Sequence, residues 1–507
     1  MNIRRETDQN TLPVAVVIAA LLAYVFHLLR YVHDDIWGSI YSVYYPCLIP
    51  ILIAFTVYFR WGKWKKEEKL FLWFAVWVYI SRLLNGDFFL ANDADMVLNT
   101  GLSFVFMVIC IALNRENRER LLEGISILTS GYFTLLSWLG LYSWLLRREL
   151  YNPLTGESIC NFEGGLYRLK LYGRNSTEVT QWFFLSLFLL LYLFFRKKSL
   201  RWRIPIAAAA ISNLLALTVT FSRSGRLAFA VCAALLVFLV ILNRIPWRSG
   251  LTRLLVVLAC IAVVTPLVYV GFNMVATGMQ HSSAFLLERI QREETAAEPS
   301  QTLAAGTLRS SASVLMPYEA DEIHQPEQTF TSSTMEALIS ENTNVAGLKA
   351  VPLNIKEDKR GLDDSGRMEI FRSIIPTIQQ EPLRLLRGCM CRDVMSISNT
   401  VLPFPKPHFH NTFLQILCLT GLPGFLVILA ICGLLSVKII RLLFSAAPVE
   451  VKSLTLVLIG TFIYNMLEVS LFVAADTRAF VAYIIAGAVL AYSYELREDC
   501  AQHVTSS

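Results

Sequence analysis

Long apolar runs recur along the chain, and they constrain its fold more than any other feature. Runs of about 16 to 20 residues, roughly the length that crosses ~30 Å of hydrocarbon as a helix, occur from Pro13–Leu29 through to Ala479–Tyr494. Of the 507 residues, 55% are hydrophobic and 17% charged, whereas soluble proteins carry about 25% charged residues. The sequence therefore predicts an all-α, polytopic membrane protein and excludes a soluble one.

Twelve of these runs are predicted to be membrane-spanning helices. Nine belong to an N-terminal membrane region, residues 1–271, and three to a C-terminal membrane region, residues 410–496, with a tail at 497–507. The predicted spans are residues 13–30, 41–59, 69–84, 97–114, 122–146, 179–196, 203–221, 224–243, 252–272, 411–436, 452–472 and 477–494. Arg4 and Arg5 precede the first span, which lacks a small-residue cleavage site, so we expect it to remain as an anchor.

Lys and Arg residues cluster after every second span. The clusters lie at residues 60–69, 115–120, 196–203, 244–253 and 438–452. Because basic loops stay in the cytoplasm during insertion, they predict a multi-pass protein of the inner (cytoplasmic) membrane with both termini cytoplasmic. Arg147 and Arg148 are an exception, since they fall on the predicted extracytoplasmic side. The formal net charge of +6 thus reflects orientation, and no nucleic-acid partner is expected.

Residues 272–409 are predicted to be one large extracytoplasmic loop. Residues 293–359 are rich in Ser, Thr, Ala and Glu without sustained periodicity, so we expect this part to be disordered. Residues 366–386 place apolar side chains near helical spacing and predict an amphipathic helix against the membrane region. Pro376 and Pro382 interrupt that pattern and predict a kink or two short helices.

Three of the ten cysteines lie in predicted extracytoplasmic loops, namely Cys160, Cys389 and Cys391. That compartment can be oxidising, so a bridge from Cys160 to Cys389 or to Cys391 is one possibility. Three unpaired thiols are the other. Most of the remaining cysteines fall within spans, where a thiol behaves as a small apolar group.

Residues 407–424 carry the densest set of candidate catalytic groups, at the entrance of the tenth span. A neutral imidazole, with an ordinary pKa of about 6.5, can accept a proton, so His410 is a candidate general base. Asn411 would cap the helix or orient the ring. Alternatively, His410 is an interfacial residue satisfied by water and Asn411 a plain N-cap. Gly421 and Gly424 are expected to kink or closely pack the helix.

Arginines next to the hydrocarbon form a second group of candidates. Arg223 and Arg226 lie in a very short turn between two spans, where a cation needs an anionic partner or a water-filled cavity. A guanidinium suits a lipid diphosphate because its planar fork makes two-point contacts with phosphate oxygens. The alternative is snorkelling to lipid headgroups, which fits Arg226 better than Arg223. Arg367, at the start of the predicted loop helix where backbone amides favour anions, and Arg372 are a third candidate, and a solvated charged face would explain them equally well. Arg174 is a weaker fourth candidate.

Acidic residues provide little further chemistry. Glu468 lies near the outer end of its span, where a carboxylate needs a partner, so we expect it to pair with an arginine. Isolated acidic pairs, such as Asp93 with Asp95 and Asp34 with Asp35, are usually solvated, and no metal is expected. The chain has no glycine-lysine phosphate loop, zinc spacing or nucleophile elbow. No cofactor is therefore expected, and energy must arrive in an activated substrate.

Three motifs, in this order around the large loop, resemble the bacterial O-antigen ligase and O-antigen polymerase superfamily. They are TFSRSGR at residues 220–226, SGRMEIFR at 365–372 and HNTFLQILCLTGLPG at 410–424. The resemblance covers roughly Tyr172 to Glu468. It implies a GT-C-like membrane glycosyltransferase that acts on undecaprenyl-diphosphate-linked glycans without metal or nucleotide. It also implies that His410 is the catalytic base and that Arg223 and Arg367 engage the diphosphate.

The reaction expected from this resemblance is displacement at the anomeric carbon, with inversion, of a lipid-linked glycan donor. Its acceptor is a glycan or a lipid, and polymerase and ligase both stay open because the same groups serve either. The insertion at residues 293–359 and GCMCRD at 388–393 depart from the family's pattern and leave the substrate open. Two alternatives are a transporter or flippase of lipid-linked oligosaccharide and a sensor or scaffold. Neither explains the His-Asn-glycine pattern, and a transporter should place charges or broken helices at mid-membrane.

Overall fold

A computed structural model describes the backbone over most of the membrane region. The described residues are 14–25, 28, 64–85, 91–152, 158–163, 167–172, 176–244, 250–297, 382–389, 411–466 and 477–506. The predicted span 41–59, the predicted disordered segment from residue 298 onward and residues 366–381 of the predicted loop helix lie outside them. So do Arg174, Arg367, Arg372, Cys391, His410 and Glu468, as well as Asp34, Asp35 and the side chains of Asp93 and Asp95.

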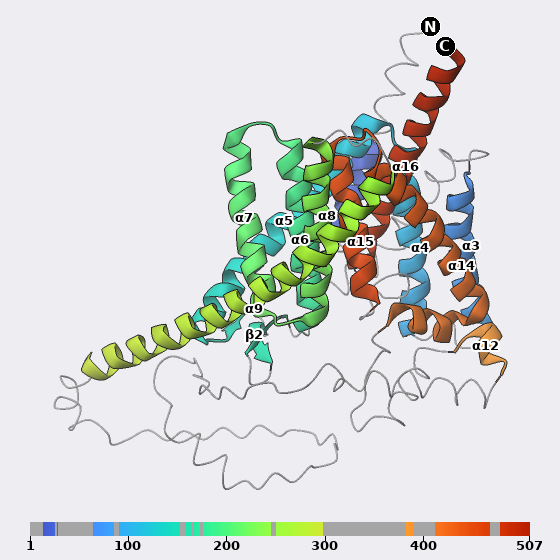
Figure 1. The fold of residues 1–507 in the computed structure, drawn as a ribbon. Coiled ribbons are helices and arrows are strands. Elements are labelled where there is room, and N and C mark those ends of the chain that lie inside the picture. The colour runs from blue at the N-terminus through green and yellow to red at the C-terminus, as the bar shows by residue number, and fades with distance from the viewer. Residues whose placement is uncertain are drawn as a thin grey trace.

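The described residues form a helical bundle (Figure 1). Its helices are Val14–Val25, α3 (Lys66–Leu84), α4 (Ala91–Ala112), α5 (Arg115–Leu146), α6 (Ser176–Arg196), α7 (Leu200–Val219), α8 (Arg223–Arg244), α9 (Gly250–Ala297), α12 (Arg384–Arg387), α14 (Thr412–Leu443), α15 (Val449–Asn465) and α16 (Thr477–Ser506). By length and composition, seven of the described helices can cross a membrane: α5, α6, α7, α8, α9, α14 and α16. The prediction of a polytopic membrane protein is confirmed, while twelve spans and a GT-C-like architecture remain predictions.

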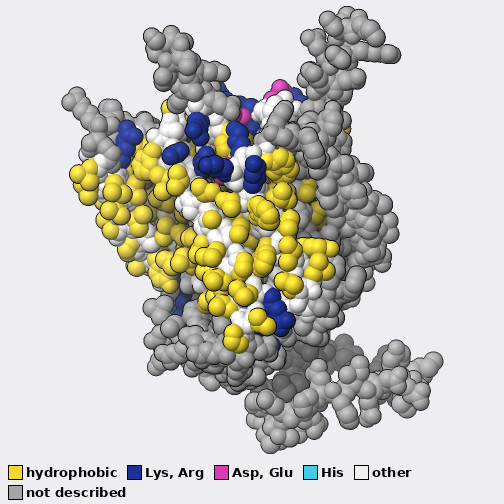
Figure 2. All heavy atoms as spheres, turned by 90° about the vertical axis from the view of Figure 1, so that its right-hand side faces the viewer, with side chains coloured by type: hydrophobic (Ala, Val, Ile, Leu, Met, Phe, Trp, Pro, Cys, Tyr) yellow, Lys and Arg dark blue, Asp and Glu magenta, His cyan; other side chains and the backbone are white. Residues whose placement is uncertain are grey.

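The helix ends gather at two opposite ends of the bundle. At the upper end in Figure 1, α5, α7, α9 and α15 begin. We call it the basic end, because it carries Arg118, Arg196, Lys197 and Lys438, and Figure 2 shows Lys and Arg side chains gathered there above an apolar belt. The helices α6, α8 and α14 begin at the opposite end, which also carries a small β-sheet, and we call it the sheet end.

The core lies among α4, α5, α6, α8, α15 and α16. The apolar stretch of α16 is 89% buried, which makes it the central helix, whereas that of α9 is 6% buried and α9 is peripheral. Stacked rings of Phe133 and Trp182, with centroids 4.4 Å apart, join α5 to α6. The apolar side chains of α9, among them Leu258 and Leu267, are instead exposed, as expected for a helix that faces lipid.

A three-stranded antiparallel sheet departs from the all-α prediction. Its strands are β1 (Leu150–Tyr151), β2 (Ser158–Glu163) and β3 (Arg168–Leu171), in the order β1-β2-β3. Cys160, Leu169 and Leu171 are buried while Arg168 and Lys170 are half-buried, so the side chains alternate between the two faces. In the sequence this alternation is hard to recognise, because the strands are short and lie between long apolar spans. The strands pack against α5 and α6, which buries their apolar side chains.

Helix α9 is much longer than the predicted span that ends at residue 272. It continues to Ala297 and projects beyond the bundle at the sheet end (Figure 1). The second half of α9 is less hydrophobic than the first, so a prediction from hydropathy ended the helix too early. The polar residues there are good helix formers, and Arg292 pairs with Glu288 one turn earlier. Residues 272–297, which were predicted to begin the extracytoplasmic loop, therefore belong to α9.

Candidate functional site

The turn before α8 places its two arginines in different surroundings. Arg223 is exposed, while Arg226 is 6% exposed. Arg226 Nη1 donates to Asn273 Oδ1 of α9 at 2.7 Å, and Arg226 Nη2 donates to the Thr218 carbonyl of α7 at 3.0 Å. Its guanidinium also lies 5.1 Å from the centre of the Phe221 ring. Snorkelling by Arg226 is therefore wrong, because its side chain holds three helices together, and Arg223 is the exposed arginine of this turn.

Asn411 begins α14 as its N-cap. Asn411 Oδ1 accepts the Leu414 N–H at 3.0 Å, which confirms the predicted cap. Asn411 Nδ2 donates to the Met466 carbonyl at 2.8 Å, and Thr412 Oγ1 donates to Asn465 Oδ1 at 2.7 Å. The beginning of α14 is thus attached to the end of α15. His410 directly precedes Asn411 in the chain and lies outside the described residues.

Helices α6 and α15 connect the beginning of α14 to that of α8. The Tyr464 hydroxyl of α15 donates to the Thr177 carbonyl at the beginning of α6. One turn further, Thr180 Oγ1 donates to Thr220 Oγ1, next to the α7–α8 turn. A Cβ on Gly225 would lie 1.9 Å from Thr180 Cγ2, so this glycine allows α6 and α8 to touch. The beginnings of α6, α8 and α14 are therefore joined at the sheet end.

Three helix beginnings at one place have an electrostatic consequence. Unpaired backbone N–H groups and the helix dipole give each beginning a partial positive charge, which favours anions. Arg223 adds a full charge at the beginning of α8. Arg478, near the beginning of α16, is 4% exposed and donates to the Glu178 carbonyl at 3.4 Å. The sequence carries no signal for Arg478, because its local pattern is that of an ordinary helix start.

Arg147, the exception to the charge alternation, is buried at the end of α5. Its guanidinium lies between the rings of Trp144 and Tyr167, at 4.4 and 4.2 Å from their centres. Arg147 Nε donates to Ser283 Oγ of α9 at 3.1 Å, and Ser283 Oγ donates to the Leu145 carbonyl at 3.0 Å. Burial lowers the pKa of Arg147 to about 10. This cation therefore joins α5, the sheet and α9, and it gives no information on orientation.

The cysteines do not form the bridge between Cys160 and Cys389. Cys160 is a free, buried thiol of β2, and burial raises its pKa to about 12. Cys389 lies elsewhere, next to α14, where its Sγ donates to the Cys418 carbonyl at 3.0 Å. The sheet holds one cysteine under α5 and α6 while α14 holds the other, so this pairing is wrong. Cys391 lies outside the described residues.

An apolar groove runs through the bundle between α3, α8, α9, α14, α15 and α16. Its volume is about 450 Å³, and its lining includes Phe238, Leu254, Ile439 and Phe462. The Phe462 ring also packs edge-on against Phe413, with centroids 5.5 Å apart. Phe413 belongs to the first turn of α14, so the lining residue Phe462 contacts the helix beginning that Asn411 caps.

Of the predicted site residues, the described structure brings Arg223, Arg226 and Asn411 to the sheet end of the bundle. Residues 206–429 match the model of a family described as O-antigen ligase. The matched segment contains all three sequence motifs, helices α8 and α9, and the first part of α14. No curated protein and no solved structure matches the chain.

Proposed function

We propose that this chain, whose residues 206–429 match the O-antigen ligase family, transfers glycan from undecaprenyl diphosphate to an acceptor on the extracytoplasmic face. The family match and the apolar helices support a membrane enzyme of the ligase or polymerase type. One observation supports glycan transfer from a lipid diphosphate in particular. Arg223 and Asn411, the neighbour of His410, begin helices that α6 and α15 join at the sheet end.

The proposed reaction is an inverting displacement without a metal. His410 takes the proton of the acceptor hydroxyl, whose oxygen then forms a bond to the anomeric carbon of the donor. The bond between that carbon and the diphosphate oxygen breaks, and the diphosphate leaves with the electron pair. Arg223 and Arg367 neutralise the charge that builds on it, which is usually the largest catalytic contribution.

Supporting roles are proposed for the remaining residues. Arg226 holds α8 against α7 and α9, and so keeps Arg223 in place. Arg174, two residues before α6, and Arg372 are proposed to add positive charge near the diphosphate. Glu468 is proposed to pair with an arginine.

The apolar groove supports a lipid-linked donor. A polyprenyl chain stays in the bilayer and needs an apolar surface, while its diphosphate needs cations at the membrane boundary. The groove supplies the first, and the Phe462–Phe413 contact brings it to the beginning of α14. Arg223 and the helix beginnings supply the second. A carrier lipid can therefore keep its tail in the groove while its headgroup reacts.

The charge distribution supports an extracytoplasmic site. Residues from the basic clusters that follow alternate spans, among them Arg196, Lys197 and Lys438, lie together at one end of the bundle, the basic end. This end is proposed to face the cytoplasm, with both termini, and the membrane to be the inner membrane. The sheet end then faces outward.

A transporter or flippase of lipid-linked oligosaccharide fits the described structure less well. Helix α14 is broken at Gly421, but the break contacts Ser81 and Arg82 in the last turn of α3, at the sheet end. Transporters place such breaks near the middle of the membrane. The break therefore favours a site at the membrane boundary.

The test is transfer by the purified full chain from a lipid-linked repeat unit, with products resolved by size. His410→Ala should lower turnover by about 100-fold or more, the usual contribution of a general base. His281→Ala, which changes an exposed histidine of α9, is the matched control and should keep wild-type turnover. A ladder of products would favour a polymerase and a single addition a ligase. Equal turnover in wild type and His410→Ala would remove the catalytic assignment.

A further inference from the structure

Helix α14 consists of two segments that meet at a break. Gly421 has φ 67° and ψ −175°, outside the helical region, and Pro423 has no N–H to donate to the Leu419 carbonyl four residues earlier. The carbonyls of Cys418, Leu419 and Thr420 therefore need other donors. We call Thr412–Thr420 the outer segment. In Figure 1 the beginning of α14 lies across the sheet end before the helix turns into the bundle.

Helix α3 supplies donors to this break. Trp77 Nε1 donates to the Thr420 carbonyl at 2.7 Å. Ser81 Oγ lies 3.1 Å from the Leu419 carbonyl oxygen, which also accepts from Arg82 Nη2. Ser81 and Arg82 are 0% and 1% exposed. A carbonyl left without a donor in such a buried place costs about 1–3 kcal/mol, so these contacts select the position of the broken end.

The same α3 residues hold the chain that returns from the polar loop. Ser81 Oγ also contacts the Arg387 carbonyl, and Asn85 Nδ2 donates to that carbonyl at 3.3 Å. The Cys389 N–H then donates to the Cys418 carbonyl at 2.7 Å. Gly388 has φ 77°, and a Cβ there would lie 2.2 Å from the Leu419 oxygen. This assigns a docking role to the start of GCMCRD, which the family resemblance left unexplained.

The outer segment is thus held at both of its ends. At its beginning, Asn411 and Thr412 attach it to Met466 and Asn465 of α15. At its end, α3 holds the carbonyls before Gly421. Nine residues of helix extend about 14 Å, so a shift at one end displaces the other by a comparable fraction. The direction of the segment therefore depends on α3 as much as on α15.

We propose that Ser81 and Arg82 are positioning residues for the transfer reaction. By holding the broken end of the outer segment and the chain at Arg387, they set the direction of the helix that begins directly after His410. This inference rests on the proposed function of His410. A reacting group displaced by about 1 Å can lose about 100-fold in rate, which makes contacts far from the chemistry matter.

The kinetic test compares Ser81→Ala, Ser81→Thr and Arg82→Met in the full-length protein. With a lipid-linked repeat unit, kcat should fall about 10-fold in Ser81→Ala and about 100-fold in Arg82→Met, while the KM for the donor changes less than about twofold. Ser81→Thr keeps the hydroxyl and should recover most of the loss. Ser126→Ala is the matched control, because among the described residues the buried Ser126 hydroxyl donates to the Leu122 carbonyl of its own helix. It should keep wild-type kcat.

A second measurement is independent of activity. Cys389 is 3% exposed because it is docked on the break, so alkylation of its thiol, quantified by peptide mass spectrometry, reports the docking. Labelling should accelerate at least about fivefold in Ser81→Ala and stay at the wild-type rate in Ser126→Ala and Ser81→Thr, since a buried thiol reacts only when the segment opens. Unchanged labelling would show that α3 does not hold this segment, and it would overturn the inference.

The two measurements separate the inference from the proposed function. If the wild-type protein transfers no glycan while Cys389 labelling still responds to Ser81→Ala, the function fails and the docking by α3 stands. If wild-type transfer is observed and Ser81→Ala opens the segment without lowering kcat, positioning is refuted. Arg82→Met removes a buried cation and can fail to fold, so Ser81→Ala, with its Ser81→Thr rescue, decides.

Discussion

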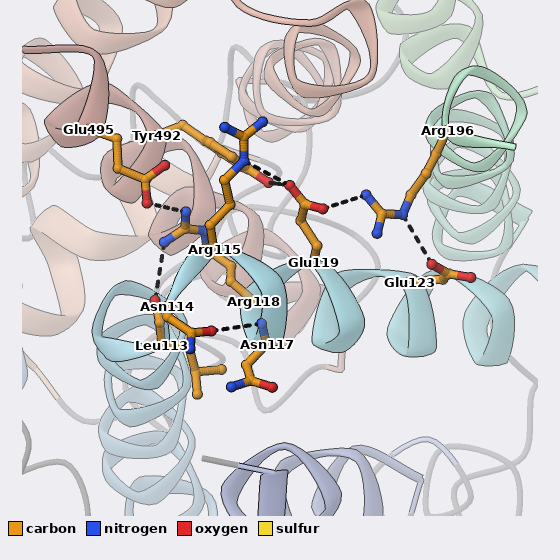
Figure 3. A network of polar contacts seen from close by, with 10 residues as sticks. All are labelled: Leu113, Asn114, Arg115, Asn117, Arg118, Glu119, Glu123, Arg196, Tyr492 and Glu495. Carbon is orange, nitrogen blue, oxygen red and sulfur yellow. Dashed lines mark hydrogen bonds and ion pairs between the residues drawn. The ribbon is translucent and has the colours of Figure 1, made fainter. Parts of the chain in front are cut away.

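The two ends of the bundle hold their cations in different ways. At the basic end, carboxylates neutralise them: Arg118 pairs with Glu495, Arg196 Nη1 with Glu119 at 2.8 Å, and Arg196 Nε with Glu123 at 3.0 Å (Figure 3). At the sheet end, Arg226 and Arg147 are held by an amide oxygen, a backbone carbonyl, a hydroxyl and aromatic rings. Ion pairs hold α5, α6 and α16 together at the first end, while at the second end neutral groups hold Arg226 and Arg147, and the exposed Arg223 adds a positive charge that favours an anion.

The largest expected effect concerns the exposed arginine of the sheet end. Arg223→Ala should lower kcat by about 100-fold, because removing one preorganised donor to a developing negative charge costs about that much. Arg223→Lys should recover only part of it, since an ammonium lacks the two-point fork. Arg201→Ala removes an exposed cation at the beginning of α7, at the basic end, and should leave kcat unchanged. Equal losses in both variants would erase the functional difference between the ends.

The next effect concerns stability at the basic end. Arg118→Met removes a cation that is 1% exposed and leaves Glu495 without its partner. We expect a loss of about 2 kcal/mol, less than for a fully buried pair because the Glu495 side chain is 37% exposed. Adding Glu495→Gln should restore part of it. Thermal unfolding in detergent measures both, and turnover per folded molecule should stay at the wild-type value.

A smaller loss is expected where α9 meets α8. Asn273→Ala removes the acceptor of Arg226 Nη1 and should destabilise the protein by about 1 kcal/mol. Thr277→Ala is its control, because Thr277 is exposed and its hydroxyl only donates to the Asn273 carbonyl of the same helix. Equal unfolding temperatures for the two variants would show that Arg226 does not depend on α9.

The smallest effect is a pH dependence that arises in the sheet. Burial raises the pKa of Cys160 from 9.0 to about 12. The unfolded chain therefore releases this proton at a lower pH than the folded chain, so the folded state loses stability as the pH rises above about 9. We expect Tm to fall between about pH 8 and pH 10, and to fall less in Cys160→Ala. Identical slopes would mean that this thiol is accessible in the folded protein.

Local patterns predicted much of the fold correctly. Hydropathy located both boundaries of α6, α7 and α8 to within about three residues, as well as the end of α5 and the beginning of α16, since a bilayer demands apolar helices of a given length. The cap at Asn411 and the break at Gly421 also followed from residue type. The sheet could not be predicted in this way because its strands are very short, and the second half of α9 could not because it is polar.

The candidate site divides in the same way. Residue type and order pointed to the arginine-rich turn, Asn411 and the preceding His410. The local pattern favoured snorkelling for Arg226 over Arg223, because it holds no record of the distant helices that bury Arg226. Packing against Asn273 and Thr218 makes the second a structural residue. Ser81 and Arg82 carried no signal in the sequence, because they act on carbonyls more than three hundred residues away.

Sequence alone was enough to predict a membrane protein with basic loops after alternate spans, and its motifs pointed to the O-antigen ligase family, whose model residues 206–429 match. Those properties depend on hydrophobicity, charge and residue identity, which are local. The tertiary structure was needed to show which cations are paired with carboxylates, that Cys160 and Cys389 lie apart, and how the broken helix α14 is held at both ends of its outer segment. These depend on contacts between distant segments, and no local pattern records such contacts.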